Sequence, residues 1–281
     1  MIVGRGFVWL RRIGLTALAL FVLVPLYAIA ITSLVPTTDL DKPFSWWPDD
    51  LTLAAFGDMW STIPLAHYLG NSLVVTICAV LLVLATAIPA GYALARMHFA
   101  GRRLLVGALI TTQAVSGLLF LLPLVLLLGE ASRRSGVTLI GSYPVLVVTA
   151  ATFALPFSIA LLGRYFAAMP ADIEDAAHDL GAGPLVTLTK VVLPNARPGI
   201  AAVALFAFAL SWGEVLFTSV LSDSGTRTVA VGLSGYAGQD AAIWNQLIAA
   251  ALLTSLPLIA AFAVMRRSLV TGLGTAMGSG E

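Results

Sequence analysis

Charge, cysteine and histidine are all scarce in this sequence of 281 residues. Only 10% of its residues are charged, against about a quarter in ordinary soluble domains. The single cysteine, Cys78, cannot form an internal disulfide or a cysteine-rich metal site, and we expect it to be a small packed residue. Apolar types make up 59% of the chain, and the mean hydropathy is +0.97. Because a soluble protein could not bury so much apolar surface, the composition indicates an integral membrane protein.

Motifs for hydrolysis and nucleotide binding are also absent. The three histidines form no HExxH motif, and the sequence contains no GxSxG nucleophile elbow. A Walker A loop requires Lys before Ser or Thr, but Lys42 precedes Pro43 and Lys190 precedes Val191. A membrane enzyme is therefore disfavoured, and an ATP-driven transporter would need another chain to bind the ATP.

Six apolar segments each approach the roughly 20 residues that a helix needs to cross a bilayer. They are Ile13–Leu34, Leu69–Leu94, Leu104–Leu128, Tyr143–Leu162, Ile200–Leu221 and Gln246–Met265. The first exceeds the apolar part of a signal peptide, so we expect an uncleaved span. The sequence thus predicts an all-α membrane protein with six transmembrane helices.

The distribution of basic residues predicts which loops face the cytoplasm. With the N-terminus inside, 11 of the 15 Lys and Arg residues fall on the inner side and 4 on the outer side, as the positive-inside rule requires. We therefore expect both termini and the loop 163–199 to be cytoplasmic. Trp46, Trp47 and Trp60 in the external loop 35–68 suit either the membrane interface or contact with an external partner.

The loop 163–199 has the pattern of two short helices separated by a glycine. Asp172, Glu174 and Asp175 favour the positive N-terminus of the first helix, and the spacing of Asp172 and Asp175 predicts a capping box. Gly181 is placed to end that helix in a left-handed conformation. This sequence pattern predicts a helix, a break and a second helix.

The second helix is predicted to begin at Pro184 and to end at Pro194. In the first helix, Ala176, Ala177 and Leu180 give a small apolar face, against which another backbone can approach closely. Such a helix suits docking into a cleft of a soluble partner. It also suits a connector on the membrane surface, and the residues alone leave both interpretations open.

Glu214 is the one acidic residue that lies clearly within a predicted span. A charge at bilayer depth costs about 2.5–3.5 kcal/mol on insertion scales, so it should face a partner or a wet cavity. It could accept hydrogen bonds from a solute, with Trp212 as a stacking surface for a sugar ring, or it could bond to a neighbouring helix. Asn71 is a further candidate for the path, although an amide near the end of a span commonly joins helices.

The loop also carries a longer motif, Glu174-Asp175-Ala176-Ala177, then Gly181, then Leu193-Pro194. It resembles the EAA loop of bacterial ABC importer permeases, with Asp175 in place of the usual Glu. Further segments resemble motifs of the carbohydrate-uptake subgroup, and the resemblance extends over 68–273. These segments are Asn71-Ser72-Leu73, Gly91–Arg96 with Phe99 and Gly101-Arg102, Trp212–Phe217, and Arg266-Arg267 with Leu273.

The resemblance implies a type I ABC importer permease fold in the bacterial inner membrane, with a cytoplasmic coupling helix that sits in a groove of an ATPase. The docking residues would be Glu174, Asp175, Ala176, Ala177 and Gly181. The candidate residues of the substrate path remain Glu214, Trp212 and Asn71. The implied partners are a second permease subunit forming a heterodimer, two copies of an ATPase subunit that bind ATP and magnesium, an extracytoplasmic solute-binding protein and membrane lipid. No cofactor of its own and no nucleic acid are expected for this chain.

We therefore expect a permease subunit that translocates a sugar or sugar derivative. The run Asp179-Leu180-Gly181-Ala182 instead resembles polyamine and iron permeases, which keeps those solutes as alternatives. A stand-alone secondary transporter is a further alternative, although it would usually have more spans or paired intramembrane charges. The expected organisation is a tail, first helix and external loop over 1–68, a permease core over 69–273 with the coupling loop at 163–199, and a tail over 274–281.

Overall fold

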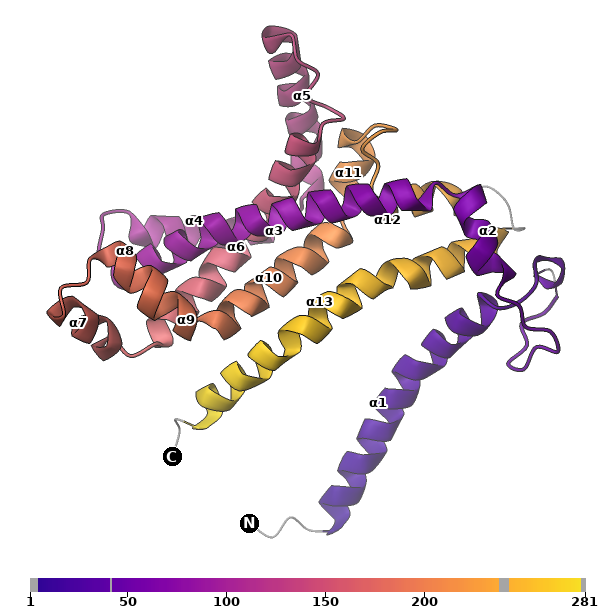
Figure 1. The fold of residues 1–281 in the computed structure, drawn as a ribbon, viewed down its shortest axis with the longest axis horizontal. Helices are drawn as coiled ribbons and strands as arrows, with labels where there is room; N and C mark the ends of the chain where they lie inside the picture. The colour runs from indigo at the N-terminus through magenta and orange to yellow at the C-terminus, as the bar shows by residue number, and fades with distance from the viewer. Residues whose placement is uncertain (1–4, 41, 238–242, 279–281) are drawn as a thin grey trace. The chain divides into compact units, whose positions relative to one another are not determined.

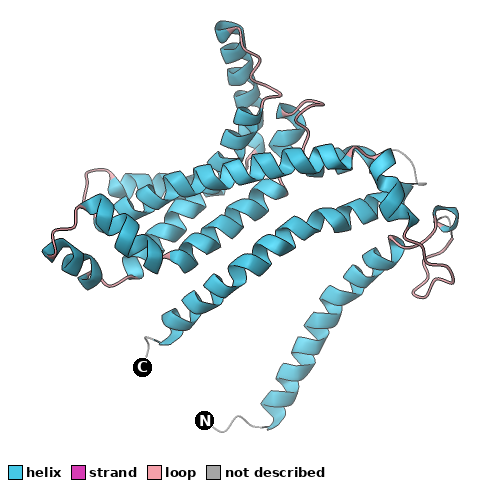
Figure 2. Ribbon diagram, in the orientation of Figure 1, coloured by secondary structure: helices cyan, strands magenta, loops and turns pink. Residues whose placement is uncertain are grey.

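The computed structural model describes residues 5–40, 42–237 and 243–278, which are almost entirely helical (Figure 2). Within these ranges no strand occurs. The prediction of an all-α protein is confirmed. The last three residues of the predicted C-terminal tail and the first four of the N-terminal tail lie outside the described residues.

Four helices of the described chain are long and apolar enough to cross a membrane. They are α1 (Arg5–Thr32), α3 (Leu65–Arg96), α6 (Tyr143–Ala168) and α13 (Trp244–Gly278). Two bent helix pairs bring the number of spans to six if each pair counts as one. Four of the six predicted segments are unbroken helices, and the third corresponds to one of the bent pairs. The other bent pair joins 184–195 to 197–212, and the fifth predicted segment is interrupted separately, after Trp212.

The third predicted segment divides into α4 (Arg102–Ala114) and α5 (Leu118–Ser135). The direction of the chain bends by 103° between these two helices. Val115 is extended between them, and Gly117 precedes α5. A Cβ on Gly117 would lie 3.3 Å from the ring of Phe217, which itself packs on Phe153 with ring centroids 4.4 Å apart. The chain therefore turns where a small residue lets an aromatic pair approach its backbone, and hydropathy alone gives no sign of this.

The fifth predicted segment divides into α10 (Arg197–Trp212) and α11 (Leu216–Leu221). Gly213 and Glu214 form the turn between them. The expectation that Glu214 lies midway along a continuous helix is therefore wrong. The break follows from the poor helix propensity of glycine and from the hydrogen bonds of Glu214 described below.

The described chain forms two compact units. The larger one comprises 68–231 and 256–281. In it α3, α6 and α10 lie side by side around a core of mostly small and aliphatic side chains (Figure 1). The buried members include Ala79, Val83, Ala87, Ala151, Ala154, Leu162, Phe166, Val203 and Ala207.

Glycines allow the helices of this core to approach closely. A Cβ on Gly91 of α3 would lie 3.0 Å from the backbone nitrogen of Gly163 in α6. A Cβ on Gly199 of α10 would lie 2.7–2.9 Å from the ring of Tyr165. Small residues of this kind are typical of helix contacts within membranes, where packing rather than hydrophobic burial holds the helices together.

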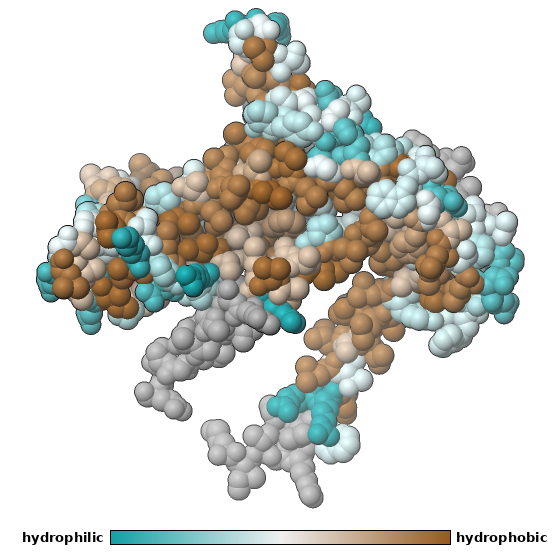
Figure 3. All heavy atoms as spheres, in the orientation of Figure 1, coloured by the Kyte–Doolittle hydropathy of each residue, from teal (hydrophilic) through white to brown (hydrophobic). Residues whose placement is uncertain are grey.

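The outer face of α3 is apolar and uncovered. Val74, Ile77 and Leu81 are 47%, 49% and 61% exposed. In Figure 3 apolar side chains cover much of the face on which α3 lies. Because water would make such a surface costly, these side chains suit contact with lipid.

The smaller unit comprises 1–67 and 232–255. It contains α1, the 3-10 helix η1 (Thr37–Asp39), α2 (Ala54–Thr62) and the first part of α13. The Asn245 amide donates to the Val35 carbonyl at 3.1 Å and to Thr37 Oγ1 at 3.2 Å. One buried side chain thus joins the start of α13 to the end of α1. The remaining elements are η2 (Leu188–Val192), α7 (Asp172–Asp179), α8 (Pro184–Thr187), α9 (Leu193–Asn195) and α12 (Val229–Tyr236).

Candidate functional site

Helix α7 is the first helix of the loop in which docking was predicted. It spans Asp172–Asp179, with all three acidic residues in its first turn. Its N-cap is Ala171, and no side chain caps it. The N–H groups of Glu174 and Asp175 bond to the Ala171 carbonyl at 2.8 and 3.0 Å. The predicted capping box is therefore wrong, because Asp172 already belongs to the helix.

Gly181 ends this helix as predicted, with a φ of +83°. Its N–H donates to the His178 carbonyl at 2.8 Å, and the Ala182 N–H donates to the Ala177 carbonyl at 3.0 Å. The Nδ1 atom of His178 also lies 3.0 Å from the Ala182 carbonyl. No atom would lie within 4 Å of a Cβ on Gly181, so its left-handed backbone, rather than crowding, favours glycine here.

Helix α8 begins at Pro184 as predicted, and the helical path ends at Asn195, one residue beyond the predicted Pro194. Within this path lie a π-helical turn, η2, and the short helix α9. Because Pro194 has no N–H to donate to the Lys190 carbonyl, the α-helical hydrogen-bond pattern gives way to the wider π-helical pattern before it. The chain bends by 79° only at Ala196, between α9 and α10.

The surface of α7 and α8 exposes apolar side chains beside the acidic first turn. Leu180 is 90% exposed and Leu185 is 73% exposed. Ile173 and Val186 are 41% and 43% exposed, and Asp175 is also exposed. We call this set, with Ala176, the α7–α8 surface. Exposed apolar side chains beside charged ones are typical of a protein contact. Leu180 was expected on the apolar face of the first helix, whereas the exposure of Leu185 was not predicted.

Glu174 differs from the other predicted docking residues because it faces inward. It is 7% exposed, and its Oε2 accepts from the Tyr92 hydroxyl at 2.7 Å. Its Oε1 accepts from Arg96 Nε at 2.8 Å. Arg96 Nη2 also donates to the Met169 carbonyl at 2.9 Å. The i, i+4 spacing of Tyr92 and Arg96 on α3 was visible in the sequence, but their acidic partner was not.

Glu214 caps the short helix α11. Its Oε1 accepts from the Phe217 N–H at 2.8 Å. Its Oε2 accepts from the Thr218 N–H at 2.9 Å and from the Thr218 hydroxyl. These local bonds offset the cost of placing a carboxylate in a hydrophobic segment. With Ser211 and Phe153, Glu214 lines a cavity of about 460 Å³ beside the break.

Asn71 and Trp212 are both buried. The Asn71 amide donates to the carbonyls of Gly225 and Arg227 at 3.0 and 2.9 Å. Its Oδ1 accepts from the Tyr143 hydroxyl at 2.7 Å. These bonds agree with the alternative given for Asn71, in which its amide joins parts of the bundle rather than binding solute. Trp212 is 8% exposed and lies parallel to the ring of Phe208, with centroids 5.6 Å apart.

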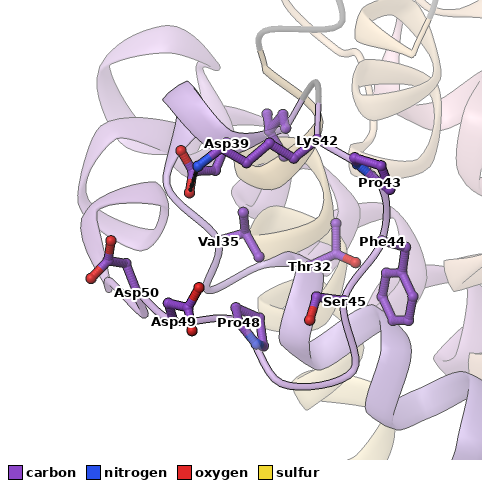
Figure 4. Close-up of a pocket in the computed structure, with 11 residues that line it drawn as sticks. Thr32, Val35, Asp39, Lys42, Pro43, Phe44, Ser45, Pro48, Asp49 and Asp50 are labelled. Carbon is purple, nitrogen blue, oxygen red and sulfur yellow. Dashed lines mark ion pairs between the residues drawn. The ribbon is translucent and has the colours of Figure 1, made fainter.

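The aromatic side chains of the external loop gather at the end of α1. The Tyr27 ring stacks on Trp46 with centroids 6.3 Å apart, and its hydroxyl donates to the Trp46 carbonyl at 2.8 Å. Figure 4 shows an adjoining cavity of about 320 Å³, lined by Asp39, Lys42, Phe44, Asp49 and Asp50 among others. Asp39 and Lys42 form an ion pair of 2.8 Å, whose hydrogen bond lowers the pKa of Asp39 and raises the pKa of Lys42.

Long apolar helices that approach one another closely at glycines are typical of an integral membrane protein. The chain belongs to the family of binding-protein-dependent transport system inner membrane components, whose model matches residues 87–273. The resemblance stated from the sequence is therefore confirmed. Membership makes the chain a multi-pass permease of the bacterial inner membrane that works with an ATPase and a binding protein.

Named relatives and a solved structure agree with this assignment. The trehalose transport system permease protein SugB of Mycobacterium tuberculosis is 30% identical over 261 residues, which cover 90% of this chain and 91% of that protein. The diacetylchitobiose uptake system permease protein DasC of Streptomyces coelicolor is 28% identical over 265 residues, covering 92% and 94%. A chain of a bacterial ABC transporter that imports the acidic polysaccharide alginate matches with a TM-score of 0.80, at 20% identity, over 95% of this chain and 99% of that one. The last match shows the fold.

Proposed function

We propose that this chain translocates a sugar or sugar derivative as one half of a heterodimeric permease. The observation that carries the proposal is the full-length similarity to permeases named for trehalose and diacetylchitobiose uptake. The two relatives differ in the sugar named, which supports the sugar class and leaves its identity to the binding protein. Two ATPase copies would bind the ATP and magnesium, and this chain would hold no cofactor.

The α7–α8 surface is our candidate for the ATPase contact. The distribution of basic residues over the whole chain, 11 on the inner side and 4 on the outer side, supports a cytoplasmic location for this loop with both termini inside. Leu180 and Leu185 would lie against apolar side chains of the ATPase, and Asp175 would meet a basic group. The left-handed turn at Gly181 fixes the angle at which the two short helices present this surface.

The break between α10 and α11 is our candidate for the part of the chain nearest the solute. Interrupted helices commonly line transport pathways, because free backbone groups there face a cavity rather than lipid. The cavity beside Glu214 and Ser211 supports this placement. Asn71 and Trp212 would then support the path without contacting solute, since both are buried among other groups.

Uptake by the reconstituted transporter tests the proposal. Vesicles containing this chain, its sister permease, the ATPase and the binding protein should accumulate a labelled disaccharide in the presence of ATP. Accumulation of a polyamine or of chelated iron in place of sugar would overturn the sugar class and support the alternative solutes. Uptake that needs only an ion gradient, without ATPase, would contradict it.

A charge placed on the α7–α8 surface tests the docking assignment. Leu180→Asp should release the ATPase from the purified complex, because it buries a charge in an apolar contact. Leu53→Asp is the matched control, since Leu53 is 71% exposed in the loop 35–68, outside that surface and outside the predicted spans. Equal ATPase recovery with Leu180→Asp and with the unaltered chain would remove α7 and α8 from the interface.

A further inference from the structure

The carboxylate of Glu174 connects α7 to the end of α3. It accepts from Tyr92 at 2.7 Å and from Arg96 at 2.8 Å, and the Glu174 and Arg96 side chains are 10% and 20% exposed. A shielded ion pair with a second hydrogen bond holds its geometry better than an exposed pair does. The connection is therefore a defined contact rather than a chance meeting of surface charges.

Arg96 also holds the end of α6. Its Nη2 donates to the carbonyl of Met169, the residue that follows α6. One guanidinium thus bonds to the inner face of α7 and to the chain that leads into it. Lysine would replace the rigid, planar set of donors with one ammonium on a flexible stem, and would hold the two acceptors less firmly.

Helix α7 is also connected to the bundle along the chain. Its backbone packs against α8 and η2, which lead through α9 into α10. Its other end leads into α6 through Pro170 and Ala171. Helix α3 is distant in sequence, with 78 residues separating Arg96 from Glu174.

We propose that Tyr92, Arg96 and Glu174 are positioning residues that make α7 and the end of α3 move as one rigid body. A displacement of α7 by the ATPase would then reach α3 directly, together with α6 and α10. The inference rests on the proposed docking of an ATPase on α7. The inference adds that the inward carboxylate of Glu174 transmits movement, while the outward Asp175 and Leu180 contact the ATPase.

Substitutions that break the cluster without crowding it provide the first test. In the complete transporter, Glu174→Gln and Arg96→Met should still co-purify with the ATPase. Solute uptake should fall about tenfold, while ATP hydrolysis without solute persists, because the energetic connection between the two sites is weakened. Arg103→Met, which changes an exposed arginine of α4, is the control and should leave uptake unchanged. Normal uptake in both cluster variants, or loss of the ATPase from them, would overturn the inference.

Cross-linking separates rigid movement from a purely structural role. Arg96→Cys and Glu174→Cys are combined in a Cys78→Ser background, since Cys78 is the only cysteine of the chain and is exposed, contrary to the expectation of a packed residue. A short bifunctional thiol reagent should restore the uptake that the two cysteines abolish, because it rejoins α3 to α7. Uptake that stays low or falls further on cross-linking would show that the helices must separate during the cycle, and would overturn the inference. Failure of the unaltered chain to retain an ATPase would instead overturn the docking proposal.

Discussion

The side-chain oxygen of Asn71, on α3, accepts a hydrogen bond of 2.7 Å from the hydroxyl of Tyr143, which starts α6. The same amide donates to Gly225 and Arg227, so three bonds converge on one buried residue. Nearby, Ser72 Oγ accepts from the Val229 N–H at 2.7 Å. The start of α3 thereby holds the loop 222–228 against two helices.

We expect Asn71→Ala to destabilise the larger unit by about 2–3 kcal/mol, since each buried hydrogen bond contributes about 1 kcal/mol. Tyr143→Phe removes only one of the three bonds and should cost about a third as much. Thermal unfolding of the purified complex measures both. A change in the KM for solute in Asn71→Ala without loss of stability would place Asn71 on the path instead.

Glu214→Ala should unfold the start of α11 because it removes the acceptor for two backbone N–H groups and one hydroxyl. Loss of such a cap costs about 1–2 kcal/mol. Thr218→Val removes the hydroxyl bond alone and is the milder control. Kinetics of uptake separate the roles: a cap changes stability and maximal rate, whereas a solute ligand changes the KM most strongly.

Gly199→Ala should destabilise the contact of α10 with α6, because the new Cβ would lie 2.7–2.9 Å from the ring of Tyr165. Overpacking of this kind costs about 1–3 kcal/mol. Gly70→Ala is the control, since no atom would lie within 4 Å of its Cβ. Equal melting temperatures for the two variants would contradict the close packing of these helices.

Gly181→Ala should weaken coupling through backbone strain alone. A left-handed residue other than glycine costs about 1–2 kcal/mol, and the site has open space for a methyl group. Gly183→Ala, with a φ of −71°, provides a neighbouring control without that strain. Solute-stimulated ATP hydrolysis should fall in the first variant only, and equal hydrolysis in both would mean that the turn tolerates another backbone conformation.

Acid should loosen the turn that begins at Asp223. Hydrogen bonds from the Thr226 hydroxyl and N–H, then from the Gly225 N–H, lower the pKa of this carboxyl below 3.8. Because its pKa is lowered in the folded protein, the Asp223 carboxylate stabilises the turn fully at pH values above its ordinary pKa. This contribution is lost as the pH falls through the lowered pKa of the folded protein. In Thr226→Val the pKa should rise toward 3.8, as carbon-detected NMR titration of labelled aspartate would measure. An unchanged pKa would exclude the hydroxyl as its main cause.

Hydropathy was sufficient to place α1, α3, α6 and α13, because a helix in lipid must be apolar over its whole length. It missed the breaks at Gly117 and Gly213, because the segments on both sides of each break are apolar overall. Those breaks depend on an aromatic ring and a capping carboxylate, which the linear pattern does not bring together.

The candidate site was also predicted only in part. Gly181 and Pro184 were predicted correctly because turns and helix starts depend on neighbours in the sequence. The inward orientation of Glu174 depends on Tyr92 and Arg96, which lie 82 and 78 residues away. A single sequence gives no signal for such pairs, although the spacing of the two α3 residues is compatible with a shared partner.

Exposure of Leu180 and Leu185 also bears on how the cell makes this subunit. On the proposed docking, a copy synthesised without its ATPase would expose these apolar side chains to chaperones and proteases. Balanced synthesis of the subunits would therefore protect it, and an unassembled excess should be degraded faster than the finished importer.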